Sequence, residues 1–117
     1  MMDTGEIKVH NFSENLFDNV VHFHVMRMKD SLFVWIGQKR ELNSLSVAMC
    51  TKYESTPAVI NVLGEQSDMT SNLLAQKFAK KLNKQCFVSY SLPPNNKLLP
   101  LVETRLLKEI ENKPSHF

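Results

Sequence analysis

Two neighbouring apolar segments, "VHFHVMRM" at 21–28 and "LFVWI" at 32–36, constrain the fold more than any other part of the sequence. Branched, aromatic and methionine residues favour strands, and the polar "KDS" between the segments predicts the turn of a hairpin. Alternate residues of a strand face opposite sides of its sheet. Neither side of this hairpin is predominantly polar, whereas a sheet with one face in water shows regular alternation. Both faces of the hairpin therefore require cover.

The rest of the chain changes between strand-like and helix-like patterns. Apolar residues recur every four positions through 74–82 and predict an amphipathic helix, with Ser67 or Asp68 as its cap and Asn83 as its left-handed stop. A second apolar stripe predicts a helix over 99–112. We further expect strands at 7–10, 44–53, 58–64 and 85–92, and a helical turn or packed loop at 12–19.

These elements predict an α+β fold with a mostly antiparallel sheet of about six strands and two main helices packed against it. The chain of 117 residues is expected to form one domain, with frayed tails at 1–6 and 113–117. A face of such a sheet measures about 580 Å², whereas two helices cover about 440 Å². The second face must then be covered by curling of the sheet or by another subunit, and the sequence leaves both options open.

Charge and composition exclude several classes of protein. The net charge is +2 without a long basic run, which disfavours nucleic-acid binding. The sequence shows no secretory signal and no apolar run of about 20 residues, so we expect neither export nor a membrane span. Cys50 and Cys86 lie in apolar runs and are expected to be buried, reduced thiols of a cytoplasmic protein, or one that is also nuclear.

The histidines are the strongest candidates for chemistry. His22 and His24 share one side of a strand, as in some metal sites, and His10 on a neighbouring strand could add a third ligand. The alternative is two ordinary, half-buried histidines, because the remaining ligand positions are unfilled. The acidic residues form no pair suited to acid–base chemistry, and the glycines form no phosphate-binding loop. The sequence thus favours an interaction protein without a cofactor over an enzyme.

A set of uncommon segments in matching order resembles the proteasome assembly chaperone 4 family. The segments are "HNFS" (10–13), "VHFHVMR" (21–27), "DSLFVWIG" (30–37), "VAMC" (47–50), "LG" and "SD" (63–64, 67–68), "LAQKFAKK" (74–81) and "NKQCFVSY" (83–90). The resemblance extends from about residue 8 to the C-terminal residue, and "SLPPNNK" at 91–97 fits least well.

The resemblance implies a small α+β protein that is not an enzyme. Members of the family pair with a homologous subunit, proteasome assembly chaperone 3. The heterodimer helps α-type subunits of the 20S core particle to form a ring, with the α5 side as the expected contact, and leaves before the particle matures. Two other functions stay open: a homodimeric structural protein, and a metal-dependent enzyme built on the histidines.

Two groups of residues are candidates for partner binding, each weighed against an ordinary structural role. The first is the apolar hairpin set, expected either to meet the sister subunit or to lie in the core: Met26, Met28, Phe33 and Trp35. The second is expected either to touch an α-subunit or to be solvated surface. It combines the loop 64–71 with a basic helix face: Gly64, Ser67, Asp68, Lys77, Lys80, Lys81 and Lys84.

Overall fold

The computed structural model describes residues 7–16, 18–51, 55–64, 69–92 and 98–117, so the tail predicted at 1–6 lies outside the described residues. The elements are β1 (Lys8–Leu16), β2 (Asn19–Arg27), β3 (Ser31–Gly37), β4 (Leu45–Met49), β5 (Ala58–Leu63), α1 (Thr70–Leu82), β6 (Gln85–Ser91), α2 (Leu98–Asn112) and the short 3-10 helix η1 (Pro114–His116). The strands form a sheet in the order β1-β2-β3-β6-β4-β5, in which only the β3–β6 pair is parallel. The predicted α+β class is confirmed.

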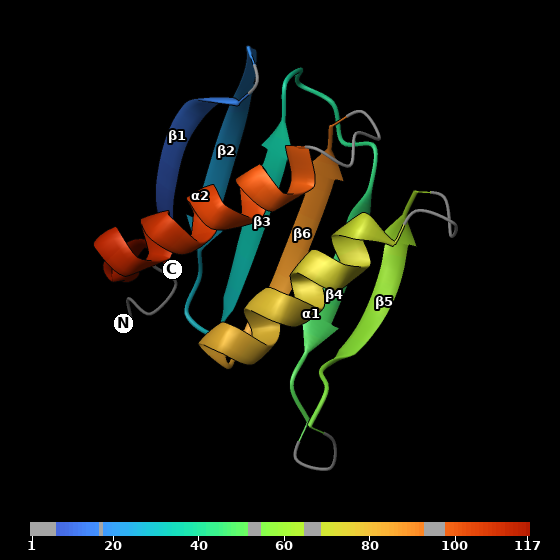
Figure 1. Ribbon diagram of the computed structural model, residues 1–117. Helices are drawn as coiled ribbons and strands as arrows, with labels where there is room; N and C mark the ends of the chain where they lie inside the picture. Colours follow the sequence, from blue (N-terminus) through green and yellow to red (C-terminus); the bar gives the residue numbers. More distant parts are fainter. Residues whose placement is uncertain (1–6, 17, 52–54, 65–68, 93–97) are drawn as a thin grey trace.

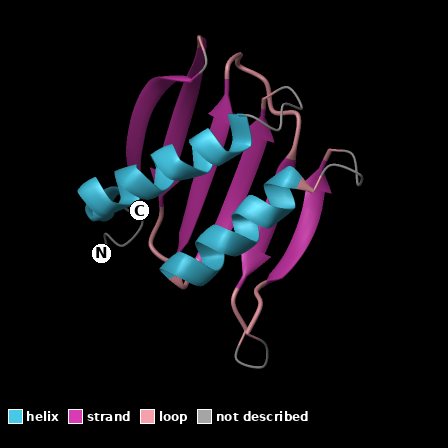
Figure 2. Ribbon diagram, in the orientation of Figure 1, coloured by secondary structure: helices cyan, strands magenta, loops and turns pink. Residues whose placement is uncertain are grey.

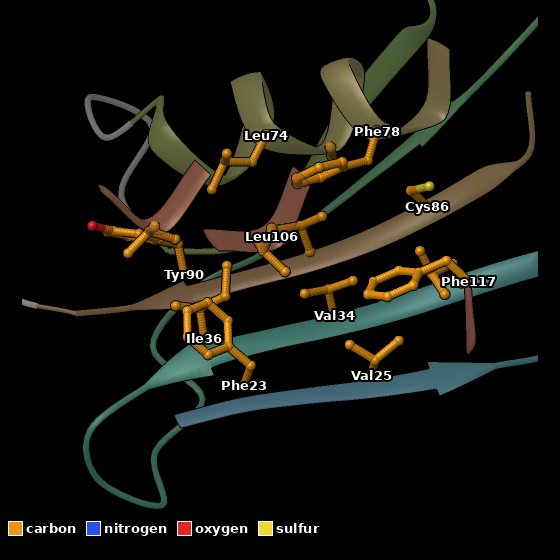
Figure 3. Packing of buried hydrophobic residues seen from close by; sticks show 14 of the residues in the cluster. Phe23, Val25, Val34, Ile36, Leu74, Phe78, Cys86, Tyr90, Leu106 and Phe117 are labelled. Atoms are coloured by element: carbon orange, nitrogen blue, oxygen red, sulfur yellow. The ribbon is translucent and has the colours of Figure 1, made fainter. Parts of the chain in front are cut away.

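Both long helices pack on the same face of the sheet (Figures 1 and 2). Helix α1 lies over β6, β4 and β5, and α2 crosses the half that contains β1, β2 and β3. Between helices and sheet, Phe78 and Leu106 meet strand residues such as Val25, Val34 and Val88 in one buried cluster (Figure 3). Neither helix is long and apolar enough to cross a membrane, as far as the described residues show.

Helix α1 follows from its sequence pattern. Leu74 and Phe78, four residues apart, point into the core, whereas Lys77 and Lys80 on the opposite side are exposed. The helix ends at Asn83, whose φ of 54° and ψ of 49° are left-handed, so the predicted stop is confirmed. The N-cap residue of the helix is Met69 and not the predicted Ser67 or Asp68, which lie outside the described residues.

Strand β1 corrects the prediction of a helical turn or loop after a short first strand. It pairs with β2 along its whole length, from Lys8 opposite Arg27 to Leu16 opposite Asn19. Phe12 and Leu16 are four residues apart, a spacing that fits a helix but equally fits alternate positions of a strand. Only pairing with β2 distinguishes the two structures.

The C-terminal segment also differs from the sequence prediction. We expected a frayed tail at 113–117, but η1 turns the chain back onto the sheet and Phe117 is only 4% exposed within the hydrophobic core (Figure 3). Arg27 Nη1 donates a hydrogen bond to the carbonyl oxygen of Ser115 at 2.7 Å. Burial of a phenylalanine ring therefore outweighs the entropy of a free segment.

The two cysteines lie in different surroundings. The strand expected over 44–53 is shorter, since β4 ends at Met49. Cys50 therefore leaves the sheet and is exposed, which corrects its predicted burial, and its Sγ donates to the carbonyl oxygen of Ala79 at 3.2 Å. Cys86 is fully buried as predicted, and burial raises the pKa of its thiol to about 12.

Candidate partner-binding surface

No described helix covers the second face of the sheet, termed here the open face (Figure 2). One row of apolar side chains crosses this face with one residue from every strand. We call it the open-face stripe: Val9, Met26, Phe33, Phe87, Val47 and Ile60. Each member stands directly opposite the next in the strand register. Val9 is 50% exposed and Ile60 65% at the two edges, and the four residues between them are half-buried.

The stripe is suited to binding another apolar surface. It contains two phenylalanines and a methionine, residue types that are enriched at protein interfaces. A continuous apolar row over the width of a sheet is uncommon on a monomer that exposes it permanently to water. All six of its side chains are apolar, which suits association with another surface.

A hollow adjoins the stripe on the open face. The next row of the sheet places Asn11 opposite His24 and His24 opposite Trp35. The indole Nε1 of Trp35 donates to the carbonyl oxygen of Glu41 at 2.8 Å, which ties the segment 38–42 to the sheet. Sheet and segment together border a hollow of about 830 Å³. The hollow is open to solvent and continuous with the stripe through Phe33.

The structure does not bring the three candidate metal-binding histidines together. His22 and His24 lie on the open face, whereas His10 stands opposite Val25 and lies on the helix-covered face. Nε2 of His10 donates to a carboxylate oxygen of Glu109 at 2.6 Å instead. Among the described residues, no three His, Cys, Asp or Glu side chains are grouped so that they could hold a metal ion.

His10 belongs to a polar cluster that closes the β1 edge of the covered face. Arg105 donates to Glu109 at 2.8 Å and its Nε lies 3.2 Å from Glu14, while His116 stacks on His10 with ring centroids 4.2 Å apart. Burial by itself raises the pKa of Glu109. The hydrogen bonds from His10 and Arg105, together with the charges of both groups, outweigh this effect and hold the pKa below its ordinary value. The cluster is a stabilising contact between α2 and β1.

The four hairpin candidates all lie away from the helix-covered core. Met26 and Phe33 belong to the open-face stripe, and Trp35 lies in the row beside it. Met28 follows β2 and is half-buried, with its Sδ accepting from Ser31 Oγ at 3.8 Å. Their contact with a partner stays a prediction.

Sequence reasoning missed the other members of the stripe: Val9, Phe87, Val47 and Ile60. The alternation of Phe87 with Val88 indicates that it faces away from the core, but it does not indicate which strand lies beside β6. Pairing of β3 with β6 brings residue 33 beside residue 87 and makes the row continuous. Such long-range pairing cannot be read from a local pattern.

The basic candidates do not form one surface. Lys77, Lys80 and Lys81 are exposed on the outer side of α1, where Lys77 Nζ lies 2.8 Å from a carboxylate oxygen of Glu103 on α2. Lys84 is half-buried and donates to the carbonyl oxygen of Phe117, and burial followed by the nearby charge of Arg27 lowers its pKa. Lys84 thus secures the C-terminal segment and Lys77 is paired with Glu103, whereas Lys80 and Lys81 are exposed on the outer side of α1.

Only the first of the three loop candidates can be placed. Gly64 is exposed directly after β5 and has a φ of 112°, a conformation that side chains other than glycine rarely adopt. Ser67 and Asp68 lie outside the described residues. The role of this loop in binding stays a prediction.

Comparisons with known proteins match this chain over nearly its full length. A family model described as proteasome assembly chaperone 4 matches residues 20–92. Proteasome assembly chaperone 4 of Homo sapiens is 48% identical and that of Mus musculus 45% identical, each over 97% of this chain and 93% of the relative. A chain from a solved structure, described as a novel chaperone complex for yeast 20S proteasome assembly, has 15% identity and a TM-score of 0.65. That match covers 93% of this chain and 95% of the other, and it shows the shared fold. The chain therefore belongs to the proteasome assembly chaperone 4 family.

Proposed function

We propose that this chain is a non-catalytic chaperone of 20S proteasome assembly that uses its open face to pair with proteasome assembly chaperone 3, its sister subunit. The open-face stripe is the observation that carries the proposal, because it leaves an apolar surface that a second subunit would cover. The relatives at 45–48% identity carry the name of an assembly chaperone. The heterodimer then promotes formation of the α-ring, in the cytoplasm or also in the nucleus.

The contact with α-type subunits is proposed for a separate surface. The exposed lysines of α1, Lys77, Lys80 and Lys81, lie on the helix side of the sheet, opposite the stripe. A sister subunit on the open face would leave them accessible. We propose that they meet an acidic surface on the α5 side of the ring, and that exposed Gly64 belongs to the same contact.

Mixing experiments test the pairing. The purified chain is combined with purified sister subunit, and elution volume and thermal midpoint are compared with those of the separate proteins. Pairing predicts an earlier elution and a higher midpoint, because a partner that binds only the folded state stabilises it. Unchanged elution and melting on mixing would overturn the pairing.

A pull-down from cell extract followed by mass spectrometry tests the role in assembly. The proposal predicts recovery of α-type subunits without mature 26S particles. A matched variant carrying glutamate at positions 77, 80 and 81 should lose the α-type subunits and keep the sister subunit. If this variant still recovers the α-type subunits together with the sister subunit, the proposed contact through α1 is wrong.

A homodimer is the competing function that the same stripe supports, because identical apolar rows can pack on each other. Mass measurement of the isolated chain separates the two. A dimer that persists after addition of excess sister subunit favours the homodimer.

A further inference from the structure

The hollow beside the stripe combines aromatic, imidazole and cationic side chains. It is lined by His22, His24 and Trp35 from the sheet and by Lys39, Arg40 and Leu42 from the segment 38–42. We propose that this hollow receives an acidic side chain, flanked by apolar residues, from the subunit that covers the open face. We call this acidic residue with its apolar neighbours the anchor. The inference rests on the proposed function and specifies one contact within the same interface.

The floor of the hollow is built into the sheet. The indole of Trp35 lies across Gly37, where a Cβ atom would stand 2.6 Å from the ring. A side chain at residue 37 would therefore displace the indole from this position. On its other side the indole holds the segment 38–42 through the hydrogen bond to Glu41, so Trp35 positions both floor and wall.

The charge of the walls determines the kind of occupant. Lys39 and Arg40 are exposed cations. The imidazoles of His22 and His24 line the same hollow and can donate hydrogen bonds. Nδ1 of His24 already lies 2.5 Å from Oδ1 of Asn11, which leaves its Nε2 for an occupant. The single acidic residue of the lining, Glu41, already accepts a hydrogen bond from Asn43 Nδ2 at 3.1 Å. A carboxylate entering the hollow would therefore meet an excess of donors and positive charge.

The flanking surface determines the rest of the anchor. Phe33 belongs both to the hollow and to the stripe, so a segment that fills the hollow continues over apolar side chains. Leu42 is exposed at the rim. An acidic residue between apolar neighbours fits a cationic hollow that is bordered by apolar side chains. A purely apolar segment would leave Lys39 and Arg40 without an anionic partner.

Charge reversal tests the anchor. Affinity for the sister subunit is measured for the wild type, for Arg40→Glu, and for Lys29→Glu as a matched control in the β2–β3 turn at the other end of the hairpin. Both positions are exposed, so folding is preserved. We expect Arg40→Glu to weaken binding by about tenfold or more and Lys29→Glu by less than about threefold. Equal effects of the two reversals would overturn the proposal.

The single tryptophan provides a second readout. Trp35 is the only tryptophan of the chain, so fluorotryptophan labelling gives one 19F signal from the floor of the hollow. We expect this signal to shift when sister subunit binds. Replacement of one acidic residue of the sister subunit by lysine should restore affinity for Arg40→Glu.

The outcomes separate this inference from the proposed pairing. If the sister subunit binds but the 19F signal does not move and Arg40→Glu binds as the wild type does, pairing stands and the anchor is wrong. If the wild type does not bind the sister subunit, the pairing fails and the anchor fails with it.

Discussion

The two faces of the sheet use the same strands but end in opposite surroundings. On the covered face, residues such as Val34 and Val88 are fully enclosed by α1, α2 and the C-terminal segment. On the open face, their neighbours Phe33 and Phe87 form an apolar row without cover from the described part of the chain. The comparison teaches that apolar residues on the covered face stabilise this chain, whereas those on the open face are free to stabilise an assembly.

The largest effect is expected from adjacent leucines on α2. Leu106 is fully buried, whereas Leu107 is 38% exposed. Because both are leucines in the same helix, replacing each by alanine changes helix propensity equally and differs only in the burial of the lost side chain. Leu106→Ala should lower the free energy of unfolding by about 2–5 kcal/mol, and Leu107→Ala by less than about 1 kcal/mol. Urea denaturation of both variants measures the difference. Similar losses would contradict the assignment of the covered face as the core.

The C-terminal segment should behave as part of the covered face. Phe117→Ala removes a buried ring and should cost about 2–4 kcal/mol, somewhat less than an internal site because the end of the segment can rearrange. Lys113→Ala, at an exposed position in the same segment, serves as the control. A thermal midpoint for Phe117→Ala equal to that of the control would show that the segment does not stabilise the core.

Glu109 brings pH dependence to the covered face. The pKa of Glu109 is lower in the folded chain than in the unfolded chain. The ionised carboxylate therefore adds to the free energy of unfolding at any pH above the unfolded pKa, and this stabilisation is lost as the pH falls through the folded pKa. Glu109→Gln should therefore be less stable than the wild type near about pH 6, by about 1–2 kcal/mol. The difference should shrink below about pH 4.5.

Denaturation curves of both proteins from about pH 6 to about pH 3 measure this effect. The other carboxylates titrate in both proteins and cancel in the comparison. A difference that does not change with pH would mean that the hydrogen bonds from His10 and Arg105 do not depend on the charge of Glu109.

The smallest effect concerns reactivity and leaves stability unchanged. Cys86 is buried on the covered face with its pKa raised to about 12, whereas Cys50 is exposed. A thiol reagent at about pH 8 should modify Cys50 alone in the native chain and both cysteines in denaturant. Modification of Cys86 at the rate of Cys50 in the native chain would contradict the tight cover of this face.

The sequence correctly predicted those elements whose structure depends on residues close together in the chain. The amphipathic pattern of α1, its stop at Asn83 and the two-sided apolar hairpin all depend on neighbouring residues. The strand nature of β1 was missed because a spacing of four fits both periods. Burial of Phe117 was missed because it depends on contacts with distant strands.

The candidate surface was predictable only in part for the same reason. Met26 and Phe33 lie close together in the sequence and could be proposed from it. The rest of the stripe required the parallel pairing of β3 with β6, which joins distant segments. The hollow required the bond from Trp35 to Glu41, which no sequence pattern indicates.

The most direct test of the open face as the partner surface is the affinity of Phe87→Glu for the sister subunit, with Leu107→Glu on the helix side as the control. Phe87 lies at the middle of the stripe, so a buried carboxylate there should weaken binding by about 30-fold or more. The thermal midpoint of the isolated variant should stay within about 4 °C of the wild type. Leu107→Glu should bind as the wild type does. Normal binding by Phe87→Glu together with lost binding by Leu107→Glu would place the partner on the helices and contradict the account.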